Sequence, residues 1–238
     1  MKNILVIAAH PDDEVLGCGG TLALLHDQDQ VTVIFLSDGE TSNNADLSGT
    51  SLTISKERRR MAQEAASLLN IQDTMFLGLP DQQLDKIPRL DIIRALQPVF
   101  DEVQPSVIYT HSQTDLNLDH RITGEVTLVL SRPVPEATVK ELYTFQIPSS
   151  EWGFSQINSG FHPNVFVDIE TTLDLKINAM KKYSSEVREF PHPRSIEMIL
   201  SSCKYWGGMS GVRSAEVFEL VRILKGSGES KNSGGKII

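Results

Sequence analysis

A histidine and several carboxylates follow the first apolar run of the chain. They are His10, Asp12, Asp13 and Glu14, in the segment AAHPDDEVLGCGGT. Pro11 favours an extended conformation at His10, and Asp13 falls where the N-cap of a helix is expected. Imidazole and carboxylate groups at this spacing can hold a divalent metal ion or transfer protons. The alternative is that the acidic residues only complement the dipole of the helix that they begin.

A second group of such residues follows another apolar run, SVIYT, in the segment THSQTDLNLDHR. It supplies His111, Asp115, Asp119 and His120. Both groups lead from a predicted strand into a predicted helix, so we expect them at the same edge of a sheet, where α/β proteins bind ligands. A His-Asp pair from the first group and one histidine from the second make a plausible zinc set with a position left for water.

The elements that must position these residues alternate between strand and helix. Continuous apolar runs predict strands buried on both faces, and apolar residues at helical period predict the helices between them. Strands are predicted at residues 3–9, 31–37, 74–77, 106–110, 141–145 and 164–169, and helices at 13–26, 55–69, 88–103, 119–130, 172–183 and 194–205. This order predicts an α/β fold with a Rossmann-like, mostly parallel sheet and helices on both faces. We expect a polar loop at 39–50, one domain over 1–224 and a disordered tail over 225–238.

Composition and charge exclude several classes of protein. The 238 residues include 22 lysines and arginines against 31 acidic residues, a formal net charge of −9. This balance argues against a nucleic-acid partner. No apolar run reaches the roughly 20 residues of a transmembrane helix, and the first strand begins too close to Met1 for a signal peptide. The only cysteines, Cys18 and Cys203, have neither pairing nor metal-site spacing, so we expect a reduced, cytoplasmic setting.

The HPDDE motif at residues 10–14, followed by a glycine-rich helix start, resembles that of the PIG-L/LmbE-like family of zinc N-deacetylases. The resemblance continues along nearly the whole chain apart from the tail. Further matching residues and segments are Ser37–Glu40, Arg58, Ala62, Ala66, Leu69, Leu79–Asp81, Asp119–Arg121, Pro191–Ser195 and Ala215–Phe218. HPDDE with a downstream Asp-His pair is a fairly specific combination, and it implies the family's fold and its hydrolysis of N-acetyl groups.

The resemblance also implies roles for individual residues. His10, Asp13 and His120 match the family's ligands for Zn²⁺, and Asp12 matches its general base. The sequence departs from the family at Asn117, where many members have a histidine that stabilises the oxyanion or acts as an acid. An asparagine can donate a hydrogen bond but cannot deliver a proton near neutral pH.

The role that Asn117 leaves unassigned has three candidates, which are His111, Asp115 and His192. His192 lies between two prolines, in a segment that matches the family, and we favour it for this role. The identity of the metal in the cell, zinc or another divalent ion, is left open.

Other residues are candidates for contact with a substrate. Arg58 and Arg59 belong to the basic run KERRR. They either reach a phosphate or nucleotide group of the substrate or form a solvated helix face. His111 and Asp115 follow the second buried strand closely enough to contact the substrate as well. Trp152 either stacks on a sugar ring or packs in the core.

The implied function is hydrolysis of the N-acetyl group of an amino sugar or sugar conjugate, which releases acetate and a free amine. A zinc esterase or amidase acting on a non-sugar substrate would use the same metal motif, and a non-catalytic carbohydrate-binding relative is favoured only by Asn117. A nucleotide-binding protein is not expected, because the GCGG segment lacks both the GxGxxG spacing and the lysine of a P-loop. The expected partner is a small N-acetylated molecule, and association into a homo-oligomer is left open.

Overall fold

The computed structural model describes residues 1–39, 49–150 and 160–226, with residues 49–54 as backbone only. The strands are β1 (Asn3–Ala8), β2 (Gln30–Ser37), β3 (Asp73–Leu79), β4 (Val107–His111), β5 (Glu141–Phe145), β6 (Val165–Asp168) and β7 (Ala215–Ile223). The helices are α1 (Asp13–Leu22), α2 (Gly49–Ala66), α3 (Arg89–Val103), α4 (Leu118–Leu130), α5 (Leu173–Lys182) and α6 (Ile196–Ser210), with short 3₁₀ turns η2 (Leu84–Lys86) and η3 (Pro148–Ser150). The predicted alternation of strands and helices is confirmed.

The strands form one sheet in the order β3-β2-β1-β4-β5-β7-β6. The five strands β3, β2, β1, β4 and β5 pair in parallel, each with the next in this order. Strand β7 pairs antiparallel with both β5 and β6. The prediction of a mostly parallel sheet is therefore confirmed, but it contained no strand at 215–223. Charged residues such as Glu216 interrupt the apolar run of β7, so its pattern does not resemble that of the buried parallel strands.

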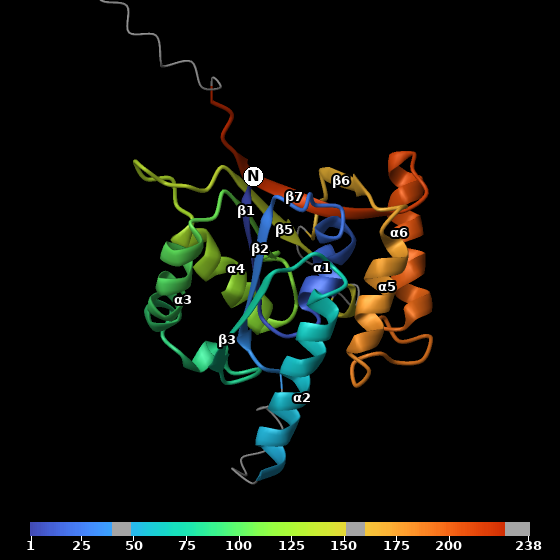
Figure 1. Cartoon of the computed structure of the whole chain (residues 1–238), viewed down its shortest axis with the longest axis horizontal. Coiled ribbons are helices and arrows are strands. Elements are labelled where there is room, and N and C mark those ends of the chain that lie inside the picture. The colour runs from blue at the N-terminus through green and yellow to red at the C-terminus, as the bar shows by residue number, and fades with distance from the viewer. Residues whose placement is uncertain (40–48, 151–159, 227–238) are drawn as a thin grey trace, which may run out of the picture.

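Helices cover both faces of the sheet (Figure 1), with α3 and α4 on one face and α1, α2, α5 and α6 on the other. Side chains of β1 alternate between the two cores. Ile4 and Val6 join the cluster that contains residues of α1 and α2, while Leu5 and Ile7 join the cluster that contains residues of α3 and α4. Burial on both faces explains why this strand is a continuous apolar run.

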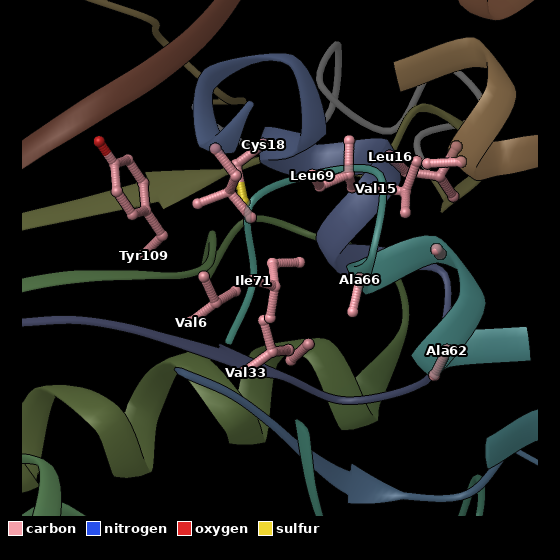
Figure 2. Packing of buried hydrophobic residues seen from close by; sticks show 14 of the residues in the cluster. Val6, Val15, Leu16, Cys18, Val33, Ala62, Ala66, Leu69, Ile71 and Tyr109 are labelled. Carbon is pink, nitrogen blue, oxygen red and sulfur yellow. The ribbon is translucent and has the colours of Figure 1, made fainter. Parts of the chain in front are cut away.

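Helix α1 packs closely on the sheet. Figure 2 shows Val15, Leu16 and Cys18 of this helix in the cluster with Val6 of β1. A Cβ atom on Gly17 would overlap the ring of Phe145. A Cβ atom on Gly20 would likewise lie 2.8 Å from Ile169, so tight packing accounts for Gly17 and Gly20 without a ligand.

Several boundaries differ from those predicted. Helix α1 ends at Leu22, where the chain turns toward β2, and α2 already begins at Gly49, within the range predicted as a loop. The rest of that loop, Trp152 and most of the predicted tail lie outside the described residues. Within the described parts of the chain, no helix is both long and apolar enough to cross a bilayer.

The two predicted motifs meet because β1 and β4 are neighbours. These strands pair in parallel, with Ile7 opposite Thr110, so their carboxyl ends lie side by side. Helices α1 and α4 begin shortly after these strand ends. The fold therefore brings segments about a hundred residues apart to one edge of the sheet, as expected for parallel strands.

Candidate active site

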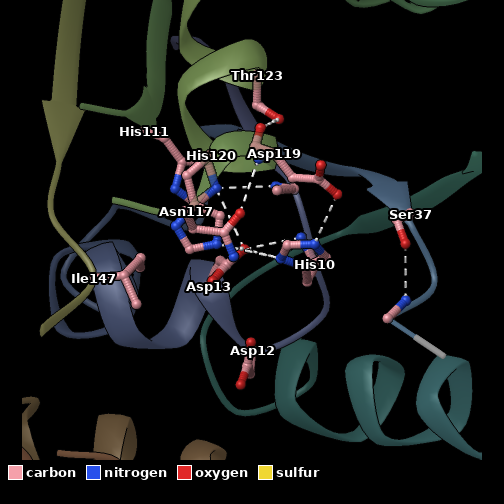
Figure 3. A network of polar contacts seen from close by, with 12 residues as sticks. His10, Asp12, Asp13, Ser37, His111, Asn117, Asp119, His120, Thr123 and Ile147 are labelled. Atoms are coloured by element: carbon pink, nitrogen blue, oxygen red, sulfur yellow. Dashed lines mark hydrogen bonds and ion pairs between the residues drawn. The ribbon is translucent and has the colours of Figure 1, made fainter. Parts of the chain in front are cut away.

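Three buried side chains from the two motifs form a triangle of donor atoms at this edge of the sheet (Figure 3). His10 Nδ1 lies 3.4 Å from Asp13 Oδ2 and 3.3 Å from His120 Nε2. The latter two atoms lie 3.5 Å apart. Ligand atoms about 2.0–2.1 Å from a tetrahedral zinc ion are separated from each other by roughly 3.3–3.4 Å. The three donor atoms thus have the spacing required to bind one zinc-sized ion.

The charges around the triangle also suit a cation. Asp13 Oδ1 is buried and has no hydrogen-bond partner among the described residues. Burial opposes ionisation of Asp13, but the neighbouring His120 and His111 hold its pKa well below the usual range. Burial likewise opposes protonation of His10, but hydrogen bonds to Asp119 and Asp13 outweigh it and raise the pKa of His10 well above its usual value. The site is therefore strongly negative, which favours either protons or a bound metal ion.

Carboxylates orient both histidines of the triangle. His120 Nδ1 lies 2.9 Å from Asp115 Oδ2, and Ser150 Oγ donates to the same oxygen at 2.9 Å. Because the carboxylate accepts a hydrogen bond from Nδ1–H, the lone pair of Nε2 points into the triangle. Asp119 Oδ2 lies 3.3 Å from His10 Nε2 and leaves Nδ1 for the triangle in the same way. Asp115, expected as a substrate contact or acid, is placed behind a histidine.

His111 is fully buried and packs behind His120, with ring centroids 4.2 Å apart. Its Nε2 accepts a hydrogen bond of 2.9 Å from the backbone N–H of Ala9. Burial and the nearby His120 lower the pKa of His111 to about 4, so the ring is neutral near pH 7. The 3.3 Å approach of the same nitrogen to Asp13 is therefore not a salt bridge. The ring has no exposed surface with which to contact a substrate.

Asp12 points away from the triangle, although it precedes Asp13 directly (Figure 3). Its φ of 119° is unusual for a residue with a side chain, and its backbone N–H donates to Glu14 at 3.1 Å. Burial raises the pKa of Asp12 to about 6, and the neighbouring Arg194 limits the rise. The strained backbone thus sends two adjacent carboxylates in different directions, one to the triangle and one to Arg194.

Arg194 is a site residue to which the sequence assigned no role. Its Nη1 lies 3.2 Å from Asp12 Oδ2 and 2.5 Å from Glu186 Oε2, and its Nε donates to Ser149 Oγ at 3.1 Å. The loop between α5 and α6 carries this residue, and Ser195 caps α6 immediately after it. The sequence signal for Arg194 was its position in the proline-rich segment that resembles the family, in which His192 was the predicted site residue.

The two arginines predicted to contact a substrate have different surroundings. Arg58 is buried, and its Nη2 lies 3.1 Å from Glu186 Oε1, so it belongs to the ion-pair network of Arg194. Arg59 instead lies over the ring of Phe76, with its guanidinium carbon 4.8 Å from the centroid. Neither arginine lines the cavity beside the triangle.

A cavity of about 330 Å³ opens beside the triangle. His120, Arg194, Gln82 and Asn117 are among the residues that line it. Asn117 is the N-cap of α4, because its Oδ1 accepts from the backbone N–H of Asp119 at 2.9 Å. With the side-chain oxygen used in this cap, the amide N–H groups are the part of Asn117 left to meet a ligand.

His192 is exposed and lies outside this cluster of contacts. Its Nδ1 accepts a hydrogen bond of 3.0 Å from the backbone N–H of Arg194, and its own N–H donates to Glu189 O at 3.0 Å. It is not among the residues lining the cavity. Most of the residues expected at the site lie together in the structure, namely His10, Asp12, Asp13, His111, Asp115, Asn117 and His120. The structure places Arg59 and His192 apart from them.

Known proteins share the sequence and fold that build this site. The family described as PIG-L, GlcNAc-PI de-N-acetylase, matches residues 5–131. The uncharacterized deacetylase YaiS of Escherichia coli is 28% identical over 191 residues, 77% of this chain and 91% of YaiS. The diacetylchitobiose deacetylase of Thermococcus kodakarensis is 26% identical over 238 residues, 93% of this chain and 84% of that protein. The conserved protein TT1542 from Thermus thermophilus has the same fold, with a TM-score of 0.71, 25% identity and coverage of 97% and 100% of the two chains.

The family match covers more than half of the chain and includes both motifs of the triangle. The family and these two sequence relatives are named as deacetylases. The family inferred from HPDDE and the downstream Asp-His pair is confirmed. The chain belongs to the PIG-L family of de-N-acetylases and is a hydrolase of N-acetyl groups.

Proposed function

We propose that the protein removes the acetyl group from the nitrogen of an amino sugar or sugar conjugate, using a zinc ion held by His10, Asp13 and His120. The observation that carries this proposal is the triangle of their donor atoms, with edges of 3.3, 3.4 and 3.5 Å. The Thermococcus relative, whose name gives an N-acetylated disaccharide as substrate, supports a sugar substrate for this chain. When bound, the ion supplies a Lewis acid for the amide carbonyl and brings the pKa of a water to about 7.

Asp12 is the proposed general base. Its buried carboxylate pairs with Arg194, and Arg194 lines the cavity beside the triangle, which supports a position of Asp12 close to a water bound there. It takes one proton as the water oxygen attacks the carbonyl carbon, and it returns this proton to the nitrogen as the C–N bond breaks. The other proton of the water stays on the carboxyl product and passes to the amine when that product ionises. The products are therefore acetate and an ammonium group, and the protons balance without another acid.

Arg194 and Asn117 have supporting roles in this scheme. Arg194 holds the Asp12 carboxylate in place through the 3.2 Å ion pair. Asn117 donates its amide N–H to an oxygen of the substrate in the cavity that both residues line. His192 receives no step, because its hydrogen bonds to other described residues lie within its own loop. His111, Asp115 and Asp119 orient the ligands from behind.

The test is acetate release by the full-length protein after metal removal and zinc addition. We expect N-acetylated sugars and sugar conjugates to release acetate only in the zinc-loaded protein, and Asp12→Ala to abolish the release. An O-acetylated sugar tested in parallel distinguishes a deacetylase from an esterase. Release from the ester alone, or from none of the compounds, would overturn the proposal.

A further inference from the structure

A second cavity, of about 410 Å³, lies against α6. Its lining includes Tyr205 and Trp206, whose ring centroids are 5.0 Å apart. Tyr205 is 60% exposed, which is high for a large aromatic side chain with a neighbour of its own kind. Helix α6 lies on the outside of the molecule beside α5 (Figure 1). Trp206 also lies near Phe166, with ring centroids 6.3 Å apart, but neither Tyr205 nor Trp206 belongs to the two core clusters of the described residues.

The linings of this cavity and of the one beside the triangle are adjacent in the chain at two places. Pro148 and Pro193 line the cavity at α6, and the residues that follow them, Ser149 and Arg194, line the cavity at His120. The Arg194 Nε donates to Ser149 Oγ at 3.1 Å and joins these two segments. A molecule bound with one end at the triangle would reach the rings of Tyr205 and Trp206 by extending past these two dipeptides.

The lining of the second cavity selects for an uncharged and amphipathic ligand. Among its described lining residues there is no charged side chain, so an extended phosphate or nucleotide group finds no partner there. Aromatic rings and prolines offer apolar surface, while Gln146 and Ser202 offer hydrogen-bonding groups. A sugar ring has this combination, because its C–H face stacks on an aromatic ring and its hydroxyls need polar partners.

We propose that the cavity at α6 is a subsite for a second, uncharged sugar ring. This inference rests on the proposed function, and it makes the substrate an N-acetylated sugar joined to at least one further sugar. The N-acetyl group lies at the triangle, and the second ring lies against Tyr205 and Trp206.

Trp206 itself provides the measurement. The chain contains two tryptophans, so a Trp152→Phe, Asp12→Ala double variant has Trp206 as its single tryptophan and does not turn substrate over. We titrate the zinc-loaded variant with N-acetylglucosamine and with N,N'-diacetylchitobiose and follow the emission. We expect the disaccharide to change the emission and to bind about tenfold more tightly than the monosaccharide, a difference within the range of aromatic contacts.

Adding Tyr205→Ala should remove most of this preference, whereas Lys204→Ala, a change at the exposed neighbouring residue, should keep it. Equal binding of the two sugars, or an unchanged preference in Tyr205→Ala, would overturn the subsite. A change of elution volume in gel filtration on Tyr205→Ala would assign the surface to a second copy of the chain and overturn it too.

Acetate release by the protein with intact Asp12 is scored separately. Disaccharide binding at Trp206 without acetate release from any sugar leaves the subsite standing and removes the proposed function. Acetate release with no change in the emission of Trp206 leaves the proposed function standing and overturns the subsite.

Discussion

His10 Nδ1 and His120 Nε2 lie 3.3 Å apart, although the two histidines are 110 positions apart in the chain. Two neutral imidazole lone pairs at this distance repel each other unless a proton or a metal ion lies between them. Asp13 adds a third donor at nearly the same distance from each. This geometry supports a metal site, and each residue around the site should then have a separable effect on metal binding, turnover or pH dependence.

Removal of a proposed ligand should remove the metal. We expect His120→Ala to lose bound zinc during gel filtration, because two donors of the triangle hold an ion much less tightly than three. Metal content by atomic emission is the measurement. His26→Ala, at an exposed histidine of the same protein, is the matched control and should retain its zinc. Zinc retained at full occupancy in His120→Ala would exclude it as a ligand.

Asp115 should act on the metal indirectly. Loss of its 2.9 Å contact with His120 frees the orientation of the imidazole, and such changes commonly weaken metal affinity by about 10–100-fold. We expect the Asp115→Ala variant to regain activity at high zinc concentration, whereas His120→Ala should not. Activity measured across a zinc titration separates the two cases. An Asp115→Ala variant with unchanged zinc affinity would contradict the orienting role.

Asp12 should matter for turnover and not for metal binding. We expect Asp12→Asn to keep its zinc and to lose about 10²–10⁴-fold in kcat, the usual contribution of a general base. The amide keeps the shape of the side chain but cannot accept the proton. Metal content and the rate of acetate release are measured on the same preparation. Wild-type turnover in this variant would remove Asp12 from the mechanism.

Arg194 should set the pH range of activity. Its cation lowers the pKa of Asp12 against the effect of burial, so its removal raises this pKa. The base must be ionised to act, and we therefore expect the acidic limb of the kcat profile to move to higher pH in Arg194→Ala. Arg194→Lys, which keeps the charge, should move it less. His192→Ala should leave the limb in place, and a limb unmoved in Arg194→Ala would contradict the contact.

A buried ion pair should stabilise the helix that carries the first motif. Lys176 Nζ lies 2.5 Å from Glu216 Oε1 and also donates to the carbonyl oxygens of Val15 and Leu16 in α1. We expect Lys176→Met to lower the free energy of unfolding by about 3–5 kcal/mol, because it leaves a buried carboxylate without its cation.

The matched control is Lys182→Met, since Lys182 is 42% exposed and lies 3.8 Å from Glu64. We expect a loss of at most about 1 kcal/mol there. Urea denaturation of both variants in the presence of excess zinc gives the comparison. An equal loss of unfolding free energy in the two variants would show that the buried ion pair contributes no more to stability than the exposed one.

Much of this site was predictable because it depends on local patterns. Continuous apolar runs predicted the strands that end at His10 and His111, and the helix signals after them predicted α1 and α4. Parallel neighbours present their carboxyl ends at one edge, so the two motifs had to converge. Strand β7 was not predicted because charged residues interrupt its apolar run. The buried Glu216 is stabilised by Lys176 and by hydrogen bonds from Gly20 and Thr21.

By itself, the sequence determined the family, the α/β order and the convergence of His10, Asp13 and His120 on one sheet edge. Only the tertiary structure decided what surrounds them. Whether a histidine faces a cavity or packs behind another ring depends on the side chains brought against it by distant segments, and so His111 is buried while His192 is exposed. The same long-range packing brings Arg194 from the α5–α6 loop to Asp12, a contact that no local pattern encodes.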